Sequence, residues 1–232
     1  IGNLTQLSYL RLDQNQLGGS LPTSIWNLVN LTDLRISGNQ LTGSISSQIG
    51  SLTKLDTLHL YDSQLSGNIP EELGNLTQLM SLFLYGNHLS GSIPSELGQL
   101  SKLTTLYLYN NQLSGSIPLE LGNLVSLTDM KLHMNHLSGS IPSELGQLSK
   151  LTTLYLYNNQ LSAMLPETIG NLPNLSELLV QSNQLTGEIP NSILNLNKIR
   201  IFEYYNNHFL TSIQGCITNS TTPVEGVTIN VT

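Results

Sequence analysis

The chain repeats itself every 24 residues, and this period constrains the fold more than any other feature of the sequence. Nine units follow one another without insertion or deletion, and they start at residues 1, 25, 49, 73, 97, 121, 145, 169 and 193. A fixed period of this length is typical of a solenoid, in which each unit contacts only its neighbours in the stack. We therefore expect one solenoid over residues 1–216, followed by an irregular tail over residues 217–232.

The apolar residues recur in a pattern that one unit cannot bury by itself. Most units follow L-x-x-L-x-L-x-x-N-x-L-x-G-x-I-P-x-x-L-G-x-L. Around Leu106–Leu108 apolar and polar residues alternate, which is the two-residue period of a strand. We expect nine such strands to form one parallel sheet on the concave face, above a core that neighbouring units share. Residues 87–114 and 135–162 are identical, which indicates that a two-unit block was copied intact.

An asparagine follows the strand in eight of the nine units. At this point the chain turns inward, and its backbone groups need hydrogen-bond partners. An inward amide offers both donors and an acceptor, so a column of asparagines can serve successive turns. The third unit has Ser63 instead, and we expect a looser turn there. The asparagines of this column are Asn15, Asn39, Asn87, Asn111, Asn135, Asn159, Asn183 and Asn207.

Glycine and proline also form columns, for example at Gly115 and Pro118. Glycine permits a positive φ, and proline favours an extended residue before it. Together they predict a second extended stretch followed by a short helix. Glutamates lie near the expected helix starts, where negative charge is favourable. These are Glu72, Glu96, Glu120 and Glu144, and the columns of glycine and proline are interrupted at Ser46, Ala163 and Thr211.

The runs L-S-G-S-I-P-S-E-L-G-Q-L and L-Y-L-Y-N-N-Q-L resemble the plant-type leucine-rich repeat. That repeat occurs in the extracellular parts of plant receptor-like kinases, in receptor-like proteins and in polygalacturonase inhibitors. The resemblance covers residues 1–213. It implies an α/β solenoid, a right-handed superhelix with a parallel concave sheet and short helices or 3-10 turns on the convex side. The cysteine-paired caps of such ectodomains are missing here, and Cys216 is the one cysteine.

Several classes of function are excluded or disfavoured by the composition. Eight Lys and Arg stand against fifteen Asp and Glu, a net charge of −7, which disfavours nucleic acid as a partner. No apolar run approaches the roughly 18 residues of a membrane-spanning helix, and no signal peptide is visible. No kinase loop motif is present, so any kinase activity would belong to a domain absent from this chain. We expect no enzyme activity and no cofactor, and a chain that is a fragment or a truncated product.

The strand residues that do not point inward are the candidates for binding a partner. Six of the nine tyrosines fall in two neighbouring columns between the third and seventh units. Exposed aromatic side chains favour a partner surface, although duplicated tyrosines that merely fit a parallel ladder are the alternative. The candidate residues of this face are Tyr61, Phe83, Tyr85, Tyr107, Tyr109, Lys131, His133, Tyr155, Tyr157, Arg11 and Arg35.

The cations and histidines of this face have simpler explanations. Arg11 and Arg35 are one unit apart and can share a carboxylate or a sulfate, but Asp13 and Asp33 lie close enough to form ion pairs with them. His59 and His133 are three units apart, on the order of 14 Å by strand spacing, which is too far to share a metal. No Ser–His–Asp arrangement can be assembled on adjacent strands.

Six sequons for N-glycosylation fit a secreted glycoprotein. We therefore expect an extracellular location, on the outer face of the plasma membrane in the parent protein. The acceptor candidates are Asn3, Asn30, Asn75, Asn174, Asn219 and Asn230.

Three functions remain open. The first is a non-catalytic recognition module of a plant receptor-like kinase or receptor-like protein, which binds a peptide, a protein ligand or a co-receptor on the concave face. The second is an enzyme inhibitor that resembles polygalacturonase inhibitors. The third is an ice-interacting or purely structural solenoid, which would need regular ladders of Thr, Ser or Asn.

Overall fold

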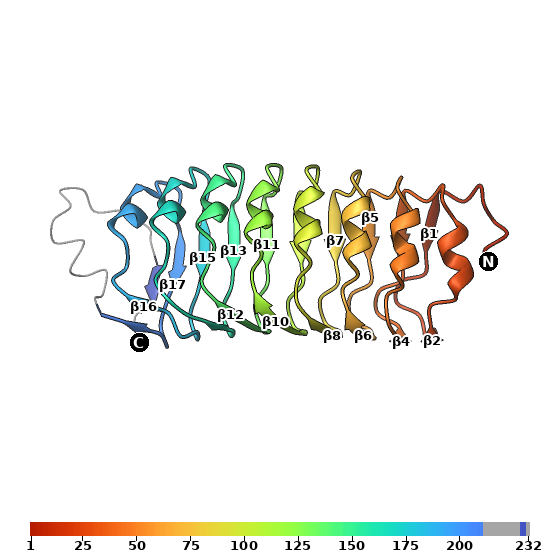
Figure 1. Cartoon of the computed structure of the whole chain (residues 1–232), viewed down its shortest axis with the longest axis horizontal. Coiled ribbons are helices and arrows are strands. Elements are labelled where there is room, and N and C mark those ends of the chain that lie inside the picture. Colours follow the sequence, from red (N-terminus) through yellow and green to blue (C-terminus); the bar gives the residue numbers. More distant parts are fainter. Residues whose placement is uncertain (211–227, 231–232) are drawn as a thin grey trace.

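The structure, a computed structural model, describes residues 1–210 and the backbone of residues 228–230. It is one elongated stack of coils that extends from the N-terminal end, red in Figure 1, to β17 near the opposite end. Each coil contributes a strand to one long sheet, a second short strand to another edge, and a short helix to a third side. The described part of the chain contains no helix long and apolar enough to cross a membrane.

The main sheet contains ten parallel strands in chain order. Nine of them fall one per repeat unit, as expected, and the tenth, β19, lies within residues 217–232 and pairs with β17. Strands of neighbouring units are in register, so that Leu82, Leu106 and Met130 lie directly opposite one another. The strands are β1 (Tyr9–Arg11), β3 (Asp33–Arg35), β5 (Thr57–His59), β7 (Ser81–Phe83), β9 (Thr105–Tyr107), β11 (Asp129–Lys131), β13 (Thr153–Tyr155), β15 (Glu177–Leu179), β17 (Ile201–Glu203) and β19 (Thr228–Asn230).

The second extended stretch that the glycine and proline columns predict forms strands on a separate side of the solenoid. Seven of its strands make one parallel sheet, here called the second sheet, and two more form a pair of their own. The second sheet contains β2 (Gly18–Ser20), β4 (Gln40–Gly43), β6 (Gln64–Asn68), β8 (His88–Gly91), β10 (Gln112–Ser116), β12 (His136–Gly139) and β14 (Gln160–Leu161). The separate pair is β16 (Thr186–Gly187) and β18 (His208–Phe209).

The break in the second sheet coincides with a break in the glycine column. The glycines of this column have φ between +73° and +79°, a conformation that a side chain disfavours. In the seventh unit Ala163 occupies the position with φ of +63°. Here β14 is only two residues long and does not pair with β16, although the backbone N–H groups of Gln184 and Thr186 still donate to the carbonyls of Leu161 and Ala163.

Each short helix is a 3-10 helix of five residues that begins after a residue in extended conformation, usually proline. In the helix Leu119–Asn123, the central residue Leu121 donates its backbone N–H to the carbonyl of Pro118. The expected glutamates lie in the first turns. The helices are η1 (Thr23–Asn27), η2 (Ser47–Ser51), η3 (Glu71–Asn75), η4 (Ser95–Gln99), η5 (Leu119–Asn123), η6 (Ser143–Gln147), η7 (Glu167–Asn171) and η8 (Asn191–Asn195).

The leucine positions of all the units merge into one core that extends from Leu10 to Tyr204. In the fifth unit the residues expected to point inward are buried, from Leu103 and Leu106 to Leu113 and Leu121. Each unit thus buries its apolar side chains against the units on both sides, which is why a solenoid is stable only as a stack.

The asparagine column forms the ladder of hydrogen bonds that the sequence predicts. The Asn111 amide donates to the carbonyls of Leu108 in its own unit and Leu84 in the preceding unit, at 3.1 and 3.0 Å. Its Oδ1 accepts the backbone N–H of Leu89 at 3.0 Å. The same set of bonds recurs at Asn39, Asn87, Asn135, Asn159, Asn183 and Asn207.

Ser63 cannot replace an asparagine in this ladder. Its hydroxyl oxygen is buried and has no hydrogen-bond partner. The serine side chain is too short to reach the preceding unit, and the third unit therefore lacks a link that the other internal units have.

The asparagine ladder can be tested by one removal and one repair. Asn111→Leu should lower the free energy of unfolding by about 1–3 kcal/mol, because buried backbone groups of two units lose their partners. Ser63→Asn should raise it. Urea denaturation measures both, and Gln112→Leu, at an exposed neighbouring position, serves as the control. Equal stability of Asn111→Leu and the wild type would contradict the ladder argument.

Candidate functional site

Two columns of side chains cover the solvent side of the main sheet in its middle five units. The first column, here called the first ladder, consists of the last residue of each of the main-sheet strands β5, β7, β9, β11 and β13. The second ladder lies two residues further along, just after each strand. The first ladder contains His59, Phe83, Tyr107, Lys131 and Tyr155, and the second contains Tyr61, Tyr85, Tyr109, His133 and Tyr157.

The rings of the second ladder form one continuous stack. From Tyr61 to Tyr157 the successive ring centroids are 4.5, 4.4, 4.4 and 4.3 Å apart, and the planes are within 19° of parallel. Strands in register place the same ring position one above another at nearly the strand spacing, which explains the stack. Nine of the ten ladder side chains are half-buried, and His133 is buried.

A lysine interrupts the first ladder in place of a ring. His59, Phe83 and Tyr107 stack at 4.1 and 4.6 Å. The ammonium of Lys131 then lies 4.8 Å from the ring centroid of Tyr107 and 4.8 Å from that of Tyr155. An ammonium between two aromatic faces makes a cation–π contact with each. The equal distances reflect the duplication, because both tyrosines come from the identical segments.

The stacking determines what the ladders present to a partner. Inside each ladder the ring faces are covered by neighbouring rings, so ring edges and hydroxyl groups face the solvent. A ring edge carries partial positive charge, and a phenol hydroxyl both donates and accepts hydrogen bonds. The face therefore suits hydrogen-bonding groups and apolar side chains rather than a flat ring stacked on top of it.

Acidic and hydroxyl side chains border the first ladder. The Tyr155 hydroxyl donates to Glu177 of β15, the adjacent strand of the main sheet. Burial raises the pKa of the Tyr107 hydroxyl to about 12, with a further contribution from the carboxylate of Asp129. His59 Nε2 lies 2.8 Å from the hydroxyl of Ser81. These contacts hold the ladder residues in place, and they were not anticipated from the sequence, because the period alone does not show which neighbours bond.

The two histidines of the ladders are held neutral. Burial lowers the pKa of His133 to about 4, and the positive charge of Lys131 adds to the effect. Burial and the charge of Arg35 lower the pKa of His59 to about 4. His133 Nδ1 is buried without a hydrogen-bond partner. No group of three His, Cys, Asp or Glu side chains in the described residues can hold a metal ion.

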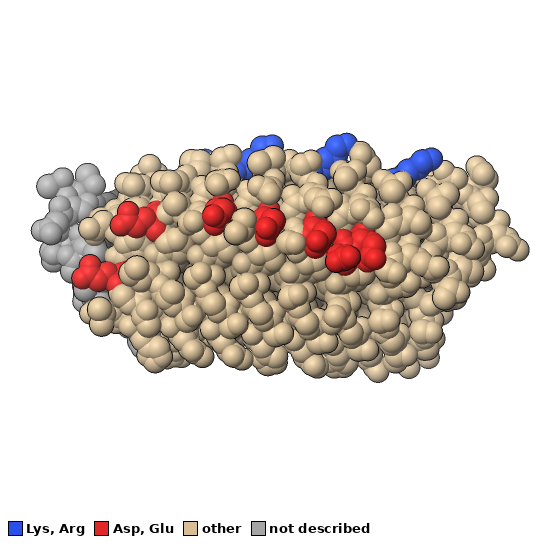
Figure 2. Space-filling view, in the orientation of Figure 1, with Lys and Arg blue, Asp and Glu red and all other residues tan. Residues whose placement is uncertain are grey.

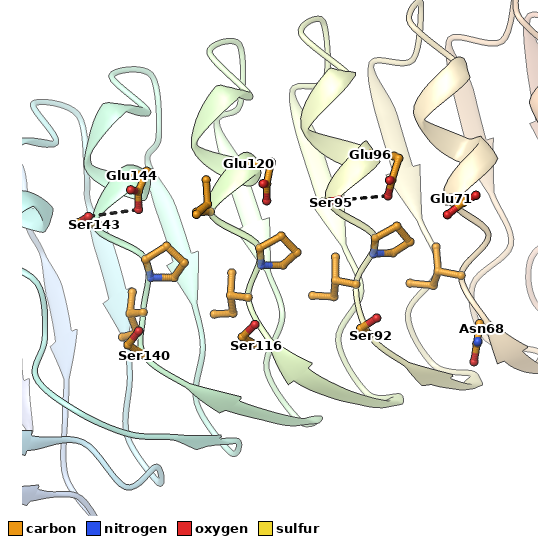
Figure 3. Close-up of a pocket in the computed structure, with 18 of the residues that line it drawn as sticks. Asn68, Glu71, Ser92, Ser95, Glu96, Ser116, Glu120, Ser140, Ser143 and Glu144 are labelled. Carbon is orange, nitrogen blue, oxygen red and sulfur yellow. Dashed lines mark hydrogen bonds between the residues drawn. The ribbon is translucent and has the colours of Figure 1, made fainter.

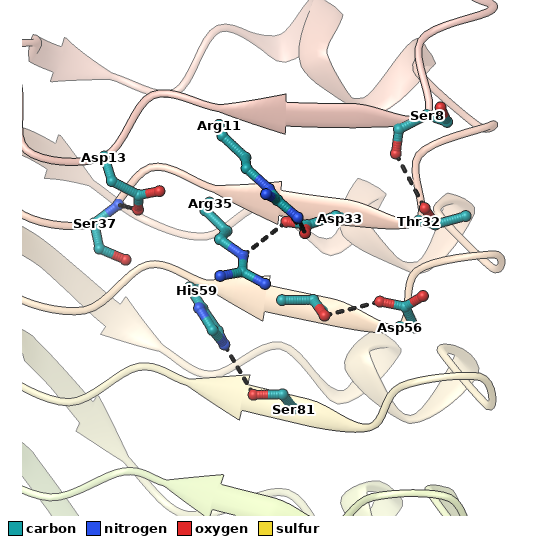
Figure 4. Close-up of polar contacts among 11 residues, drawn as sticks. Ser8, Arg11, Asp13, Thr32, Asp33, Arg35, Ser37, Asp56, His59 and Ser81 are labelled. Atoms are coloured by element: carbon teal, nitrogen blue, oxygen red, sulfur yellow. Dashed lines mark hydrogen bonds and ion pairs between the residues drawn. The ribbon is translucent and has the colours of Figure 1, made fainter.

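The arginines at the N-terminal end of the face form the expected ion pairs, as Figure 4 shows. The buried carboxylate of Asp33 accepts from Arg11 at 2.5 Å and from Arg35 at 2.9 Å. Asp13 does not take part in a salt bridge. Instead its carboxylate accepts the backbone N–H of Ser37 at 2.9 Å. One carboxylate thus positions both guanidinium groups, and Arg11 remains largely exposed.

The sequons differ in how their amides are used. Asn3 and Asn75 are exposed. The amides of Asn30 and Asn174 donate to backbone carbonyls of the preceding unit, and their oxygens accept from lysines of the next. Asn219 and Cys216 lie outside the described residues, and for Asn230 only the backbone is described.

Two family models match the chain. The model for the leucine-rich repeat region matches residues 1–117, and the single leucine-rich repeat model matches residues 126–148, 150–172 and 174–196. Neither indicates a catalytic family. A search of curated proteins finds no match.

Solved structures of plant receptors are similar to the chain. One is the leucine-rich repeat ectodomain of the receptor kinase GASSHO1/SCHENGEN3 from Arabidopsis thaliana in complex with CASPARIAN STRIP INTEGRITY FACTOR 2, with 42% identity and a TM-score of 0.89. Another is the plant peptide hormone receptor RGFR1 in complex with RGF2, with 41% identity and a TM-score of 0.88. Each match covers 90% of this chain, but only 25% and 34% of the receptor chains.

A plant ice-binding protein of known structure is also similar, with 29% identity and a TM-score of 0.77. This match covers 90% of the chain and 67% of the ice-binding protein.

The buried His133 should make stability depend on pH. Its pKa in the folded chain lies below the ordinary value of about 6.5, so the unfolded chain takes up the proton first. Stability is therefore full above pH 6.5 and falls as the pH drops towards 4. His133→Tyr, which fits a column of tyrosines, should reduce the loss between pH 7 and pH 5 by about 1–2 kcal/mol in urea titrations. The control is His88→Gln at an exposed position, and an unchanged pH dependence in His133→Tyr would refute the assignment.

Proposed function

The chain belongs to the leucine-rich repeat family, and on this premise we propose that it is a non-catalytic recognition module of a plant cell-surface receptor, which binds a peptide or protein on its two ladders. The observation that carries the proposal is the continuous aromatic surface over five units of the main sheet. Among the similar structures, RGFR1 is a plant peptide hormone receptor in complex with RGF2, which supports the same class of ligand for this chain. An extracellular location follows from this role, and a co-receptor is a further partner that it implies.

The chemistry of the ladders suits an extended peptide. Tyrosines supply large contact areas at little cost in side-chain entropy, and here stacking has already ordered their rings. Their hydroxyl groups form a row that can bond the backbone of a peptide lying across the strands. Lys131 provides one fixed positive charge within this row. An inhibitor of a secreted basic hydrolase would instead need a face dominated by acids, and we rank that function second among the protein-binding alternatives.

Removing the two rings that flank Lys131 tests the proposal. The probes are synthetic plant peptide hormones, RGF2 among them, and binding is measured by calorimetry. Tyr107→Ala with Tyr155→Ala should weaken a bound peptide at least tenfold, about 1.4 kcal/mol. Stability should also fall, by about 0.5–1.5 kcal/mol for each lost ring contact, and binding is therefore measured well below the melting temperature.

The matched control removes two tyrosines outside the ladders, Tyr9→Ala with Tyr205→Ala. It should leave peptide binding unchanged. A panel in which no peptide binds, or in which both double variants bind equally, would exclude the ladders as the binding face.

A second candidate function is interaction with ice, and the second sheet is the observation that favours it. Its strands contain no Asp, Glu, Lys or Arg, and the strands together with the residues just after them carry columns of hydroxyl and amide groups at the spacing of the strands. The similarity to a plant ice-binding protein supports this candidate. The columns are Thr42, Ser66, Ser90, Ser114 and Ser138, and beside them Ser20, Ser44, Asn68, Ser92, Ser116 and Ser140.

Inhibition of ice recrystallisation in frozen sucrose separates the two candidates. If the second sheet contacts ice, Ser114→Lys with Ser138→Lys should abolish the inhibition, because charged side chains stay hydrated and disrupt the regular columns. The Tyr107→Ala and Tyr155→Ala pair should retain it. The absence of inhibition by the wild-type chain would rule this candidate out.

A further inference from the structure

A long groove lies between the second sheet and the 3-10 helices, away from the ladders. It has a volume of about 1090 Å³ and extends from Asn68 of the third unit to Pro166 of the seventh. Figure 3 shows its three parts: serines and Asn68 along one wall, isoleucine and proline side chains along the floor, and glutamates along the other wall. The lining glutamates are Glu71, Glu96, Glu120 and Glu144.

Each unit builds the groove from the same short segment, such as Ser116–Glu120 in the fifth. Ile117 points into the core and is 3% exposed, while Pro118 is half-buried at the surface. Because proline has no backbone N–H, the floor offers no donor at that position and is mainly apolar. The polar contacts available to a bound molecule therefore come from the two walls.

The backbone of three of these glutamates is held firmly at the rim. The backbone and Cβ of Glu96, Glu120 and Glu144 pack on a glycine of the preceding 3-10 helix. An added Cβ at Gly98 would lie 2.4 Å from the carbonyl oxygen of Glu120, and one at Gly122 would lie 2.6 Å from that of Glu144. Only glycine permits so close an approach. The backbone positions of these three glutamates are therefore fixed in a row, one per unit, at roughly the 4.8 Å spacing of the stack.

The charge of this row is not balanced within the described part of the chain. Both salt bridges found there involve Asp33, on the other side of the molecule. Ser95 and Ser143 donate to Glu96 and Glu144 at 3.2 and 3.1 Å, but a hydroxyl does not neutralise a carboxylate. Figure 2 shows the acidic row along this face, with the visible lysines and arginines on a separate edge. Like charges stacked in register are destabilising, so a cationic partner would relieve a strain already present.

We propose that this acidic groove docks an extended segment of a partner protein that carries several lysines or arginines. Four units span on the order of 15 Å, the length of four to five residues in extended conformation. Cationic side chains of such a segment reach the glutamate wall, its backbone reaches the serine wall, and small apolar side chains lie on the isoleucine–proline floor. Because the groove and the ladders lie on different sides, the proposal is independent of what the ladders bind.

The simplest alternative is that the glutamates only stabilise the starts of the 3-10 helices. Each helix has five residues, so this contribution is small. The two explanations differ in what neutralising the row does. If the glutamates serve the helices, Glu→Gln lowers stability, whereas if they repel one another it does not.

The test uses the whole chain and a capped synthetic heptapeptide of alternating lysine and alanine. Calorimetry at low salt should show binding by the wild type, and the affinity should fall as salt is raised. Glu96→Gln with Glu120→Gln should weaken binding at least tenfold while melting at or above the wild-type temperature. The matched control, Glu177→Gln with Glu203→Gln, makes the same change in net charge on the main-sheet side and should bind as the wild type does.

Several results would overturn the proposal. One is the absence of binding to the lysine peptide, and another is equal weakening in both double variants, which would show a general attraction to an acidic protein. A clear drop in melting temperature in the groove variant would assign the glutamates to the helices. Equal affinity for the free polyamine spermine would show that the groove selects charge without selecting a peptide.

Discussion

The two binding faces depend on the asparagine ladder, because in every unit from the second to the ninth except the third it holds the coil at a fixed height and angle above the preceding one. The hydrophobic core supplies most of the stabilisation, but apolar contacts have little direction and tolerate sliding. The amide of Asn111, by contrast, bonds carbonyls of two units at once, and its oxygen holds a third backbone group. This sets the register in which side chains of the same column meet.

The two faces discussed above are consequences of that register. On the main sheet it brings rings to within 4.6 Å of one another, so that their edges rather than their faces meet the solvent. On the helix side it brings carboxylates into a row that no cation of the described chain balances. Exact repetition thus produces attraction where the repeated side chain is aromatic and repulsion where it is charged.

The period of 24 residues was enough to predict the columns, the parallel main sheet, the buried leucines and the asparagine ladder. It was also enough to place the residues of the first and second ladders together, because residues that are 24 positions apart in the sequence fall in the same column of the solenoid. The ring orientations, the bond from Tyr155 to Glu177 and the burial of Asp33 were not predictable, because they depend on rotamers and on which neighbour a side chain reaches. The groove was missed because its walls come from two different edges of each coil. The strand β19 lies outside the repeat, so the period gives no information about it.

The interrupted glycine column has a mechanical consequence. Between the seventh and eighth units, at Ala163, the second sheet loses its strand pairing and keeps two backbone hydrogen bonds, from Gln184 to Leu161 and from Thr186 to Ala163, while the main sheet continues across the junction. A solenoid whose units contact only their neighbours bends most easily where its lateral connections are weakest. The stack should therefore be stiff over the five units that carry the ladders and compliant immediately after them. The affinity of a molecule that contacts both sides of this junction would depend on the curvature of the solenoid. A molecule confined to the first and second ladders would bind a rigid surface.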